Sequence, residues 1–174
     1  MADRMFDEYE TERALIKVAD GDGTGLTVLY EKLGKKVFSL AFSILSDRSA
    51  AEDATQETFY KVLRFAGNYR KGENAAAWIM AIARNTSIDM VRRRRDVSAD
   101  EDAIEAVPEE GDFTEALEVN ELLMALNETD RNIVILKAVD GFRFKEIGKI
   151  VGLTPAAAQK RYRRALKQLR PLFE

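Results

Sequence analysis

The sequence of 174 residues contains no cysteine and no histidine. Without cysteine the chain can form no disulfide framework, no thiolate metal site and no thiol redox switch. Without histidine it lacks the commonest metal ligand and the usual general base at neutral pH. Carboxylates are plentiful, but no acidic cluster accompanies a glycine-rich phosphate loop. We therefore expect no catalytic activity, no bound metal and no cofactor.

Long apolar segments are also absent from the sequence. The longest strongly apolar run, residues 37–45, is nine residues long and contains two serines, whereas a membrane-spanning helix needs about 20 apolar residues. The first ten residues are rich in charge and lack the apolar core of a signal peptide. These features predict a cytoplasmic protein.

The net charge of −3 conceals an uneven distribution of charge along the chain. Residues 1–95 carry a net charge of +2, residues 96–126 carry eleven acidic side chains and no basic one, and residues 127–174 carry a net charge of +6. Two cationic ends can approach a nucleic-acid backbone that repels the acidic middle. The charge pattern thus indicates two binding modules on either side of an acidic segment.

Helical periodicity dominates the sequence, and we find no convincing alternation of a β-strand. An apolar stripe predicts a helix over residues 26–45, within which Gly34 predicts close packing. The next helix is expected to begin with a capping box formed by Ser49 and Glu52 and to end near Ala66. Further helices are expected at 74–95, 114–126, 128–139, 143–151 and 155–169. The predicted fold class is all-α, with two small helical domains, residues 1–95 and 114–174, joined by an acidic flexible linker, residues 96–113.

The last two predicted helices form a helix-turn-helix pattern. The first ends at Gly152, and Thr154 and Pro155 are the preferred cap and first residue of the second. On the second helix the apolar face consists of Ala158, Tyr162, Ala165 and Leu169, and the cationic face of Lys160, Arg163, Arg164 and Lys167. Such a helix packs on its domain and presents cations to DNA phosphates. An amphipathic helix pair with a solvated basic face has the same pattern.

Three features of the first domain suggest binding surfaces, and each has a structural alternative. One helical face is either an ordinary solvated surface or a docking surface for a basic partner; it consists of Asp53, Gln56, Glu57, Tyr60 and Arg64. Trp78 follows a short polar loop and is either a core residue or a stacking platform for a single-stranded base. Four consecutive arginines, residues 92–95, exceed what capping a helix needs and indicate contact with nucleic acid.

Three segments of the chain are of interest together: residues 51–59, residues 77–85 with Ile88, Asp89, Arg92 and Arg93, and residues 144–164. In this order they resemble motifs of the bacterial extracytoplasmic-function (group IV) sigma factors of the sigma-70 family. The resemblance implies a promoter-specificity subunit of the bacterial cytoplasm, without activity of its own. Its partners would be core RNA polymerase, through the β′ clamp and the β subunit, promoter DNA and an anti-sigma factor. Residues 1–95 would be sigma region 2, and residues 114–174 would be sigma region 4.

The resemblance also implies roles for individual residues. Polymerase would bind Asp53, Gln56, Glu57 and Tyr60. The −10 element would contact Tyr69, Arg70, Lys71, Asn74, Trp78, Asn85, Asp89, Arg92 and Arg93. The −35 element would contact Gln159, Lys160, Arg163 and Arg164. The last helix departs from the common family pattern at residues 156–158 and at Arg163, so the docking mode is transferred to this chain but the base specificity is not.

Two other classes of protein fit parts of the sequence. A helix-turn-helix repressor with a ligand-binding or dimerising N-terminal bundle predicts tight binding of the free protein to a palindromic site. A helical adaptor protein explains the apolar stripes but not the segregation of charge. A sigma factor instead predicts weak DNA binding alone and promoter opening only together with core polymerase.

Overall fold

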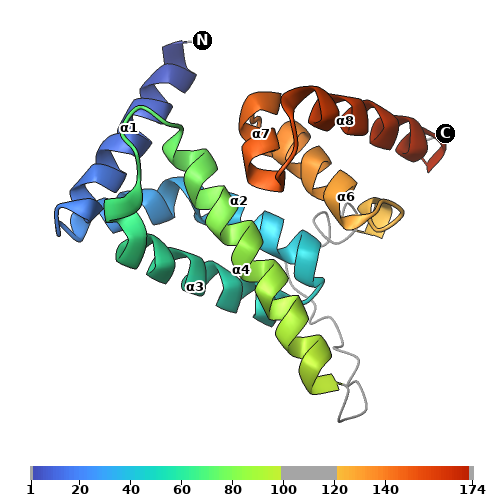
Figure 1. The fold of residues 1–174 in the computed structure, drawn as a ribbon, viewed down its shortest axis with the longest axis horizontal. Coiled ribbons are helices and arrows are strands. Elements are labelled where there is room, and N and C mark those ends of the chain that lie inside the picture. The colour runs from blue at the N-terminus through green and yellow to red at the C-terminus, as the bar shows by residue number, and fades with distance from the viewer. Residues whose placement is uncertain (1, 99–120, 173–174) are drawn as a thin grey trace.

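The computed structural model describes residues 2–98 and 121–172, and all regular elements in these ranges are helical (Figure 1). The first domain contains α1 (Ala2–Ala19), α2 (Thr24–Leu45), α3 (Arg48–Phe65), the 3-10 helix η1 (Ala66–Asn68) and α4 (Ala75–Ser98). The second contains α6 (Glu128–Val134), the π-helix η2 (Ile135–Val139), α7 (Phe144–Val151), α8 (Pro155–Leu169) and the 3-10 helix η3 (Arg170–Leu172). The predicted all-α class with two helical domains is confirmed.

Helix α2 is the central helix of the first domain and packs against α1, α3 and α4. Its predicted apolar stripe is buried, and Leu29, Val37 and Leu40 are fully inaccessible to solvent. Helix α1 was not predicted from the sequence. It buries Ala14, Leu15 and Val18, a short apolar face within a segment otherwise rich in charge.

Two local predictions for the first domain are wrong. The N-cap of α3 is Asp47, whose carboxylate accepts a hydrogen bond from the Ala50 amide at 2.7 Å, whereas Ser49 lies inside the helix. An aspartate and a serine are equally good caps, so sequence alone could not choose between them. Gly34 does not mark close backbone packing, because the atoms nearest to a Cβ atom there belong to the Tyr30 ring, at an ordinary 3.6 Å.

The helix-turn-helix of the second domain forms as predicted. Thr154 caps α8 by accepting a hydrogen bond from the Ala157 amide, and Pro155 is the first helical residue. Gly152 ends α7 with a φ of 72°, in the left-handed region that favours glycine. Ala158 and Ala165 are fully buried, and the cations predicted for the opposite face of α8 are exposed.

At Gly148 α7 passes close to the turn, and we expect Gly148→Ala to destabilise the second domain by about 1–3 kcal/mol. A Cβ atom at this position would lie 2.5 Å from the Leu153 carbonyl oxygen, so the turn would have to move. Thermal unfolding would measure the loss. Gly67→Ala is the matched control, because no atom lies within 4 Å of its Cβ position. Equal melting temperatures for the two variants would contradict this packing.

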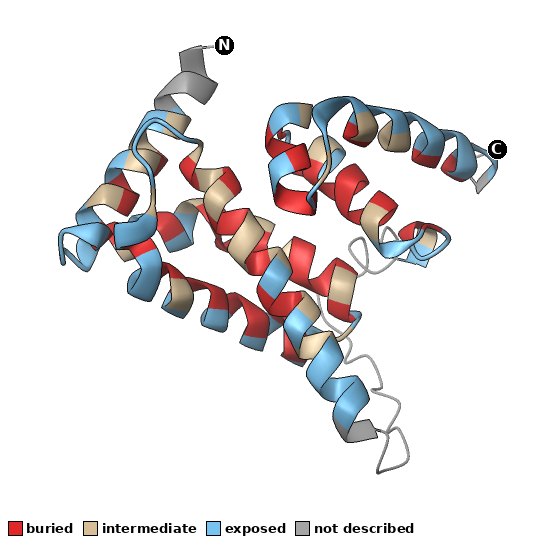
Figure 2. Ribbon diagram, viewed as in Figure 1, coloured by how far each residue is buried: buried red, intermediate tan, exposed pale blue. Residues whose placement is uncertain are grey.

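The two domains pack against each other, with α6, α7 and α8 together on one side of the first domain (Figure 1). One buried apolar cluster includes residues of both domains, and α6 is buried along most of its length (Figure 2). Helix α4 continues to Ser98, three residues into the expected linker; the rest of that segment lies outside the described residues. Of the expected helix 114–126, only residues 121–126 are described, and residues 121–123 are helical.

The contact between the domains also includes polar side chains. The Arg131 guanidinium donates to the Ser43 carbonyl at 2.7 Å, and the Ser43 hydroxyl contacts the Asn132 amide oxygen at 3.4 Å. Arg84 lies 3.8 Å from the Glu128 carboxylate, and the Lys36 ammonium donates to the Asp140 carbonyl at 3.3 Å. Among the described residues, the buried side-chain polar atoms without a hydrogen-bond partner belong to Arg84, Arg131, Asn132 and Asp140. All four residues thus lie where the domains meet.

No helix within residues 2–98 and 121–172 combines the length and the apolar character needed to cross a membrane.

Candidate nucleic-acid interface

The outer face of α3 carries the residues predicted to bind a protein partner. Asp53, Gln56, Glu57 and Tyr60 are all exposed on it. The Arg64 guanidinium lies over the Tyr60 ring at 5.8 Å, and Glu57 is 3.8 Å from the Lys61 ammonium. Leu63 and Phe65, which were not predicted as site residues, are also exposed near the end of this helix. Carboxylates beside exposed aromatic and aliphatic groups suit docking of a protein.

The loop between η1 and α4 is anchored from α1 and carries two exposed cations. The Glu12 carboxylate accepts hydrogen bonds from the Gly72 amide at 2.6 Å and from the Tyr69 hydroxyl at 3.0 Å. Burial, assisted by the hydrogen bond to Glu12, raises the pKa of Tyr69 above its ordinary range. The Tyr69 ring meets the half-buried Trp78 edge to face, at 5.8 Å between centroids, while Arg70 and Lys71 are exposed. Glu12 lies 57 positions before Tyr69, and no local signal identifies it.

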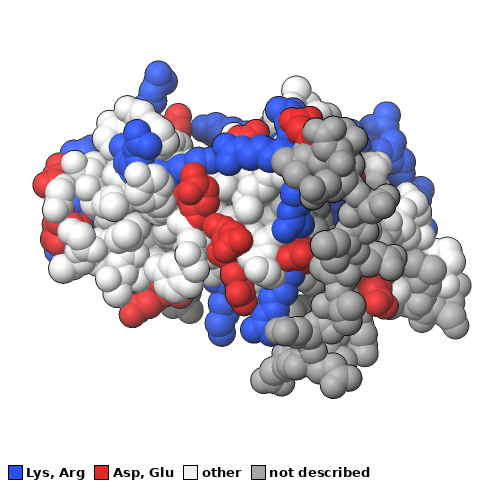
Figure 3. Space-filling model, turned by 90° about the horizontal axis from the view of Figure 1, so that it is seen from below, with Lys and Arg blue, Asp and Glu red and all other residues white. Residues whose placement is uncertain are grey.

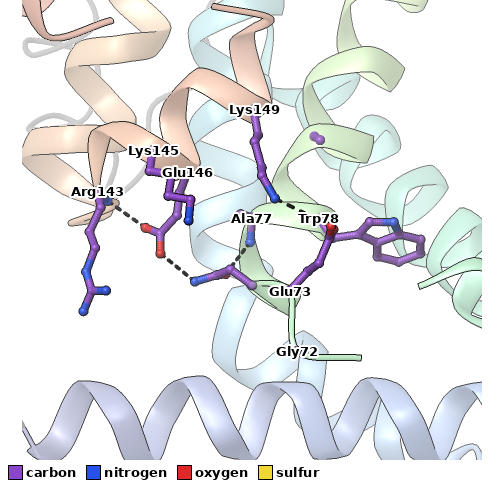
Figure 4. Close-up of a pocket in the computed structure, with 10 residues that line it drawn as sticks. Gly72, Glu73, Ala77, Trp78, Arg143, Lys145, Glu146 and Lys149 are labelled. Atoms are coloured by element: carbon purple, nitrogen blue, oxygen red, sulfur yellow. Dashed lines mark hydrogen bonds and ion pairs between the residues drawn. The ribbon is translucent and has the colours of Figure 1, made fainter. Parts of the chain in front are cut away.

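Asn74 connects this loop to the second domain. Its side-chain oxygen accepts from the Ala77 amide at 2.8 Å and so caps α4, while its amide nitrogen donates to the Glu146 carboxylate at 2.8 Å. Glu146 also accepts from the Arg143 amide and thereby caps α7. The second link is an ion pair of 3.7 Å between Glu73 and Lys149. Residues of both links line a cavity of about 340 Å³ between the loop and α7, and Figure 4 shows Glu73, Glu146 and Lys149 at its wall.

The C-terminal half of α4 presents the remaining residues predicted to contact −10 DNA. Asn85, Asp89, Arg92 and Arg93 are exposed and follow one another along the helix at spacings of four, three and one. Of the four consecutive arginines, Arg94 lies 3.8 Å from the Asp47 carboxylate. On the face of the molecule in Figure 3, the described acidic and basic side chains lie among one another.

The second domain presents α8 as its basic surface. Gln159, Lys160, Arg163 and Arg164 are exposed, as their predicted contact with DNA requires. Tyr162 turns inward and meets the Phe144 ring edge to face, at 5.6 Å between centroids. This contact helps to fix the angle between α7 and α8.

A buried carboxylate lies beneath the α8 cations and was not predicted. Asp130, in α6, is 2.5 Å from Arg161 Nε and 3.0 Å from Arg164 Nη2. Burial opposes ionisation of this carboxyl, but hydrogen bonds from Arg161, Arg164 and Asn127 outweigh it and lower its pKa. The sequence signal was too weak to find Asp130, because more than 30 residues separate it from its arginine partners.

The predicted residues therefore fall on three surfaces: the outer face of α3, the loop with α4, and α8. The structure brings Tyr69 and Trp78 into contact and ties Asn74 to α7. It also engages Arg164 with Asp130, whereas Lys160 and Arg163 have no ion pair among the described residues. The predicted roles in polymerase and DNA binding remain predictions.

Two models of protein families match the chain in order: Sigma-70 region 2 over residues 29–97 and Sigma-70 region 4 over residues 116–169. The chain is 31% identical to the RNA polymerase sigma factor CarQ of Myxococcus xanthus over 160 residues, which cover 88% of this chain and 92% of that protein.

Two solved structures have a similar fold. The sigma factor RpoE of Bartonella quintana, in complex with the anti-sigma factor NepR, aligns with a TM-score of 0.73 and 25% identity, over 83% of this chain and 93% of that chain. CnrH, in complex with the cytosolic domain of CnrY, aligns with a TM-score of 0.76 and 21% identity, over 94% of this chain and 97% of that chain.

Proposed function

Since the chain belongs to the extracytoplasmic-function sigma factors of the sigma-70 family, we propose that it binds core RNA polymerase and directs it to promoters for transcription initiation. The proposal is carried by one observation: the matches to region 2 and to region 4 follow each other along the chain, one in each helical domain. The function is that of a transcription initiation factor, acting in the bacterial cytoplasm. Residues 1–95 form the polymerase-binding and −10-binding domain, residues 96–113 the linker and residues 114–174 the −35-binding domain.

Polymerase docks on the outer face of α3. The exposed carboxylates Asp53 and Glu57, with Gln56 between them, meet a basic surface of the β′ clamp. Tyr60, together with the exposed Leu63 and Phe65, supplies the apolar contact that charged groups alone do not provide. This mixture of groups supports a protein partner rather than DNA, because phosphates would be repelled by the carboxylates.

The loop before α4 and the outer face of α4 bind the −10 region. Arg70 and Lys71 attract the phosphates, and the pair formed by Tyr69 and Trp78 offers an aromatic surface for an unstacked base. Stacking of a base on an aromatic side chain contributes about 1–3 kcal/mol. Asn85, Asp89, Arg92 and Arg93 continue this surface along α4.

Helix α8 enters the major groove of the −35 element. Lys160, Arg163 and Arg164 supply the phosphate and guanine contacts, and Gln159 hydrogen-bonds to a base edge. The two domains bind different parts of one promoter, so each can bind weakly while polymerase holds them at the correct separation.

The packed arrangement of the domains is a closed state that opens when the chain binds polymerase. A permanent core seldom leaves buried polar atoms unpaired, yet four residues with such atoms gather where the domains meet. Separation of the domains would let water reach these atoms and would release Asn74 and Glu73 from α7. An anti-sigma factor would act by stabilising this closed arrangement; the similar sigma factor RpoE forms a complex with the anti-sigma factor NepR.

Closure is expected to weaken with rising pH, by about tenfold between pH 6 and pH 8. Burial raises the pKa of Asp140 to about 7, although the nearby Lys36 ammonium opposes this shift. In the open state the hydrated Asp140 carboxyl has a pKa near 4, so at a pH between about 4 and 7 it must take up a proton when the domains close. Closure therefore becomes less favourable as the pH rises toward 7. Fluorescence transfer between dyes on engineered cysteines would report the closed fraction. Asp140→Asn should abolish the pH dependence of the closed fraction. If the variant keeps the pH dependence of the wild type, Asp140 is not the group that causes it.

Co-purification with core RNA polymerase tests the proposed function. The purified chain, free of any inhibitor, should form a stoichiometric complex with bacterial core enzyme and bind promoter DNA poorly on its own. The rival function, a helix-turn-helix repressor, predicts the reverse: tight binding of the free chain to a palindromic site and no complex with polymerase.

A further inference from the structure

Asp130 is a buried carboxylate that links the interior of the second domain to its basic surface. Its side chain is 2% exposed, and one oxygen accepts from Arg161 Nε at 2.5 Å. The other oxygen accepts from Arg164 Nη2 at 3.0 Å and from the Asn127 side-chain amide at 2.7 Å. Asn127 caps α6 through the Asp130 amide, so the helix terminus itself fixes the carboxylate.

The two arginines differ in how they are placed. Arg161 is the more enclosed, with 30% of its side chain exposed, and its second contact is to Asn127, also within the domain. Arg164 follows one turn later on the same flank of α8, and 63% of its side chain is exposed. Arg161 thus joins α8 to α6, whereas Arg164 extends from Asp130 to the outer surface.

We propose that Asp130 is a positioning residue for promoter recognition: it holds the Arg164 guanidinium on the outer face of α8 in the conformation that contacts DNA. This inference rests on the proposed role of α8 in binding the −35 element. It assigns a function to a residue that does not itself touch DNA.

The chemistry of the guanidinium supports this assignment. Arginine has five N–H donors in a planar fork, and Asp130 uses the donor at Nη2. This bond fixes the orientation of the planar guanidinium group, and thereby the directions of its remaining N–H donors. These donors can contact a phosphate or the O6 and N7 atoms of a guanine. A long side chain that is already ordered loses less rotamer freedom on binding. The bond to Asp130 therefore favours the bound geometry before DNA arrives.

Simple electrostatics predicts the opposite effect for the loss of Asp130. A carboxylate close beneath a DNA-binding surface repels phosphates, so neutralising it should strengthen DNA binding. Positioning predicts that neutralising it weakens binding, because Arg164 is no longer directed. The two explanations therefore differ in the sign of the expected change.

The test uses full-length chain assembled with core RNA polymerase and a promoter fragment that the wild-type holoenzyme selects from random-sequence DNA. Asp130→Asn keeps the shape of the side chain and removes its charge. We expect this variant to bind the fragment about five- to tenfold more weakly. Binding that is unchanged or tighter would overturn the proposal. If the wild-type holoenzyme selects no sequence at all, the proposed function fails instead.

A double-mutant cycle separates positioning from a general structural role. In the Arg164→Gln background, Asp130→Asn should weaken binding no further, whereas in the Arg163→Gln background it should keep its full effect. Arg163 is the matched control because it is an exposed arginine of the same helix without a contact to Asp130. Equal effects in both backgrounds would overturn the proposal, since a purely structural carboxylate acts through the fold of the domain.

A second variant covers the case in which Asp130→Asn unfolds the domain, which thermal unfolding would detect. Arg164→Lys keeps the charge at an exposed position but replaces the fork by a single ammonium. It should weaken holoenzyme binding to the selected fragment about fivefold or more, to the level of Arg164→Gln. If Arg164→Lys binds as tightly as wild type, charge alone suffices at this position and the positioning role of Asp130 is wrong.

Discussion

Reversing the charges of Asp53 and Glu57 together, to lysine, is expected to weaken binding to core RNA polymerase at least about 100-fold. Loss of a close charge pair across an interface costs about 2–5 kcal/mol, and reversal adds repulsion from a basic surface. Both side chains are exposed on α3, so the fold should be unaffected. A titration of core enzyme with fluorescently labelled chain would measure the affinity.

Charge reversal elsewhere on the first domain is the matched control for this prediction. Asp20→Lys combined with Glu31→Lys makes the same change in net charge at exposed positions away from α3, in the turn after α1 and on helix α2. The control should bind polymerase within about threefold of wild type, since screening limits remote charges. If both double variants lose affinity equally, α3 is not the docking surface.

Locking the domains together is expected to reduce promoter-dependent transcription more than about tenfold. The chain has no cysteine of its own, so cysteines placed at Glu73 and Lys149, whose side chains form a 3.7 Å ion pair, can be joined selectively. A short linker with a reducible bond would hold the loop before α4 against α7, and DNA could not reach Tyr69 and Trp78. Transcription by core enzyme with the locked chain would measure the effect.

The same double-cysteine variant supplies its own control. Before cross-linking, and again after reduction, it should support transcription within about twofold of wild type, because the lost ion pair is a surface pair that contributes little. A locked chain that is as active as the reduced chain would show that transcription does not require the closed state to open.

Elements with strong local signals could be predicted from the sequence. Helices α7 and α8 have clear periodicity, a glycine at the turn, and a threonine followed by a proline at the start of α8. The apolar stripe of α2 was equally clear. Helix α1 was missed because charged residues fill the sequence around its short buried face. Local patterns therefore identify helices whose apolar face is long and clearly separated from their polar face.

Contacts between distant residues could not be predicted. Glu12 anchors a loop about 60 positions away, Glu146 caps α7 and also binds Asn74, and Asp130 directs arginines more than 30 positions later. Each is a single acidic side chain in a helix, indistinguishable in sequence from a solvated one. Exposure of the predicted site residues on α3, on the C-terminal half of α4 and on α8 followed from helical spacing, but the contacts of the half-buried Tyr69, Asn74 and Trp78 depend on how the helices pack.

Opening of the −10 region by the reconstituted holoenzyme tests the central claim most directly. A promoter fragment selected by the holoenzyme, carrying a fluorescent base analogue in the −10 element, would report unstacking of the bases. We expect a fluorescence increase only when the chain and core polymerase are both present, and its loss with Trp78→Ala. No increase with the complete mixture, or an equal increase with either protein alone, would contradict the account.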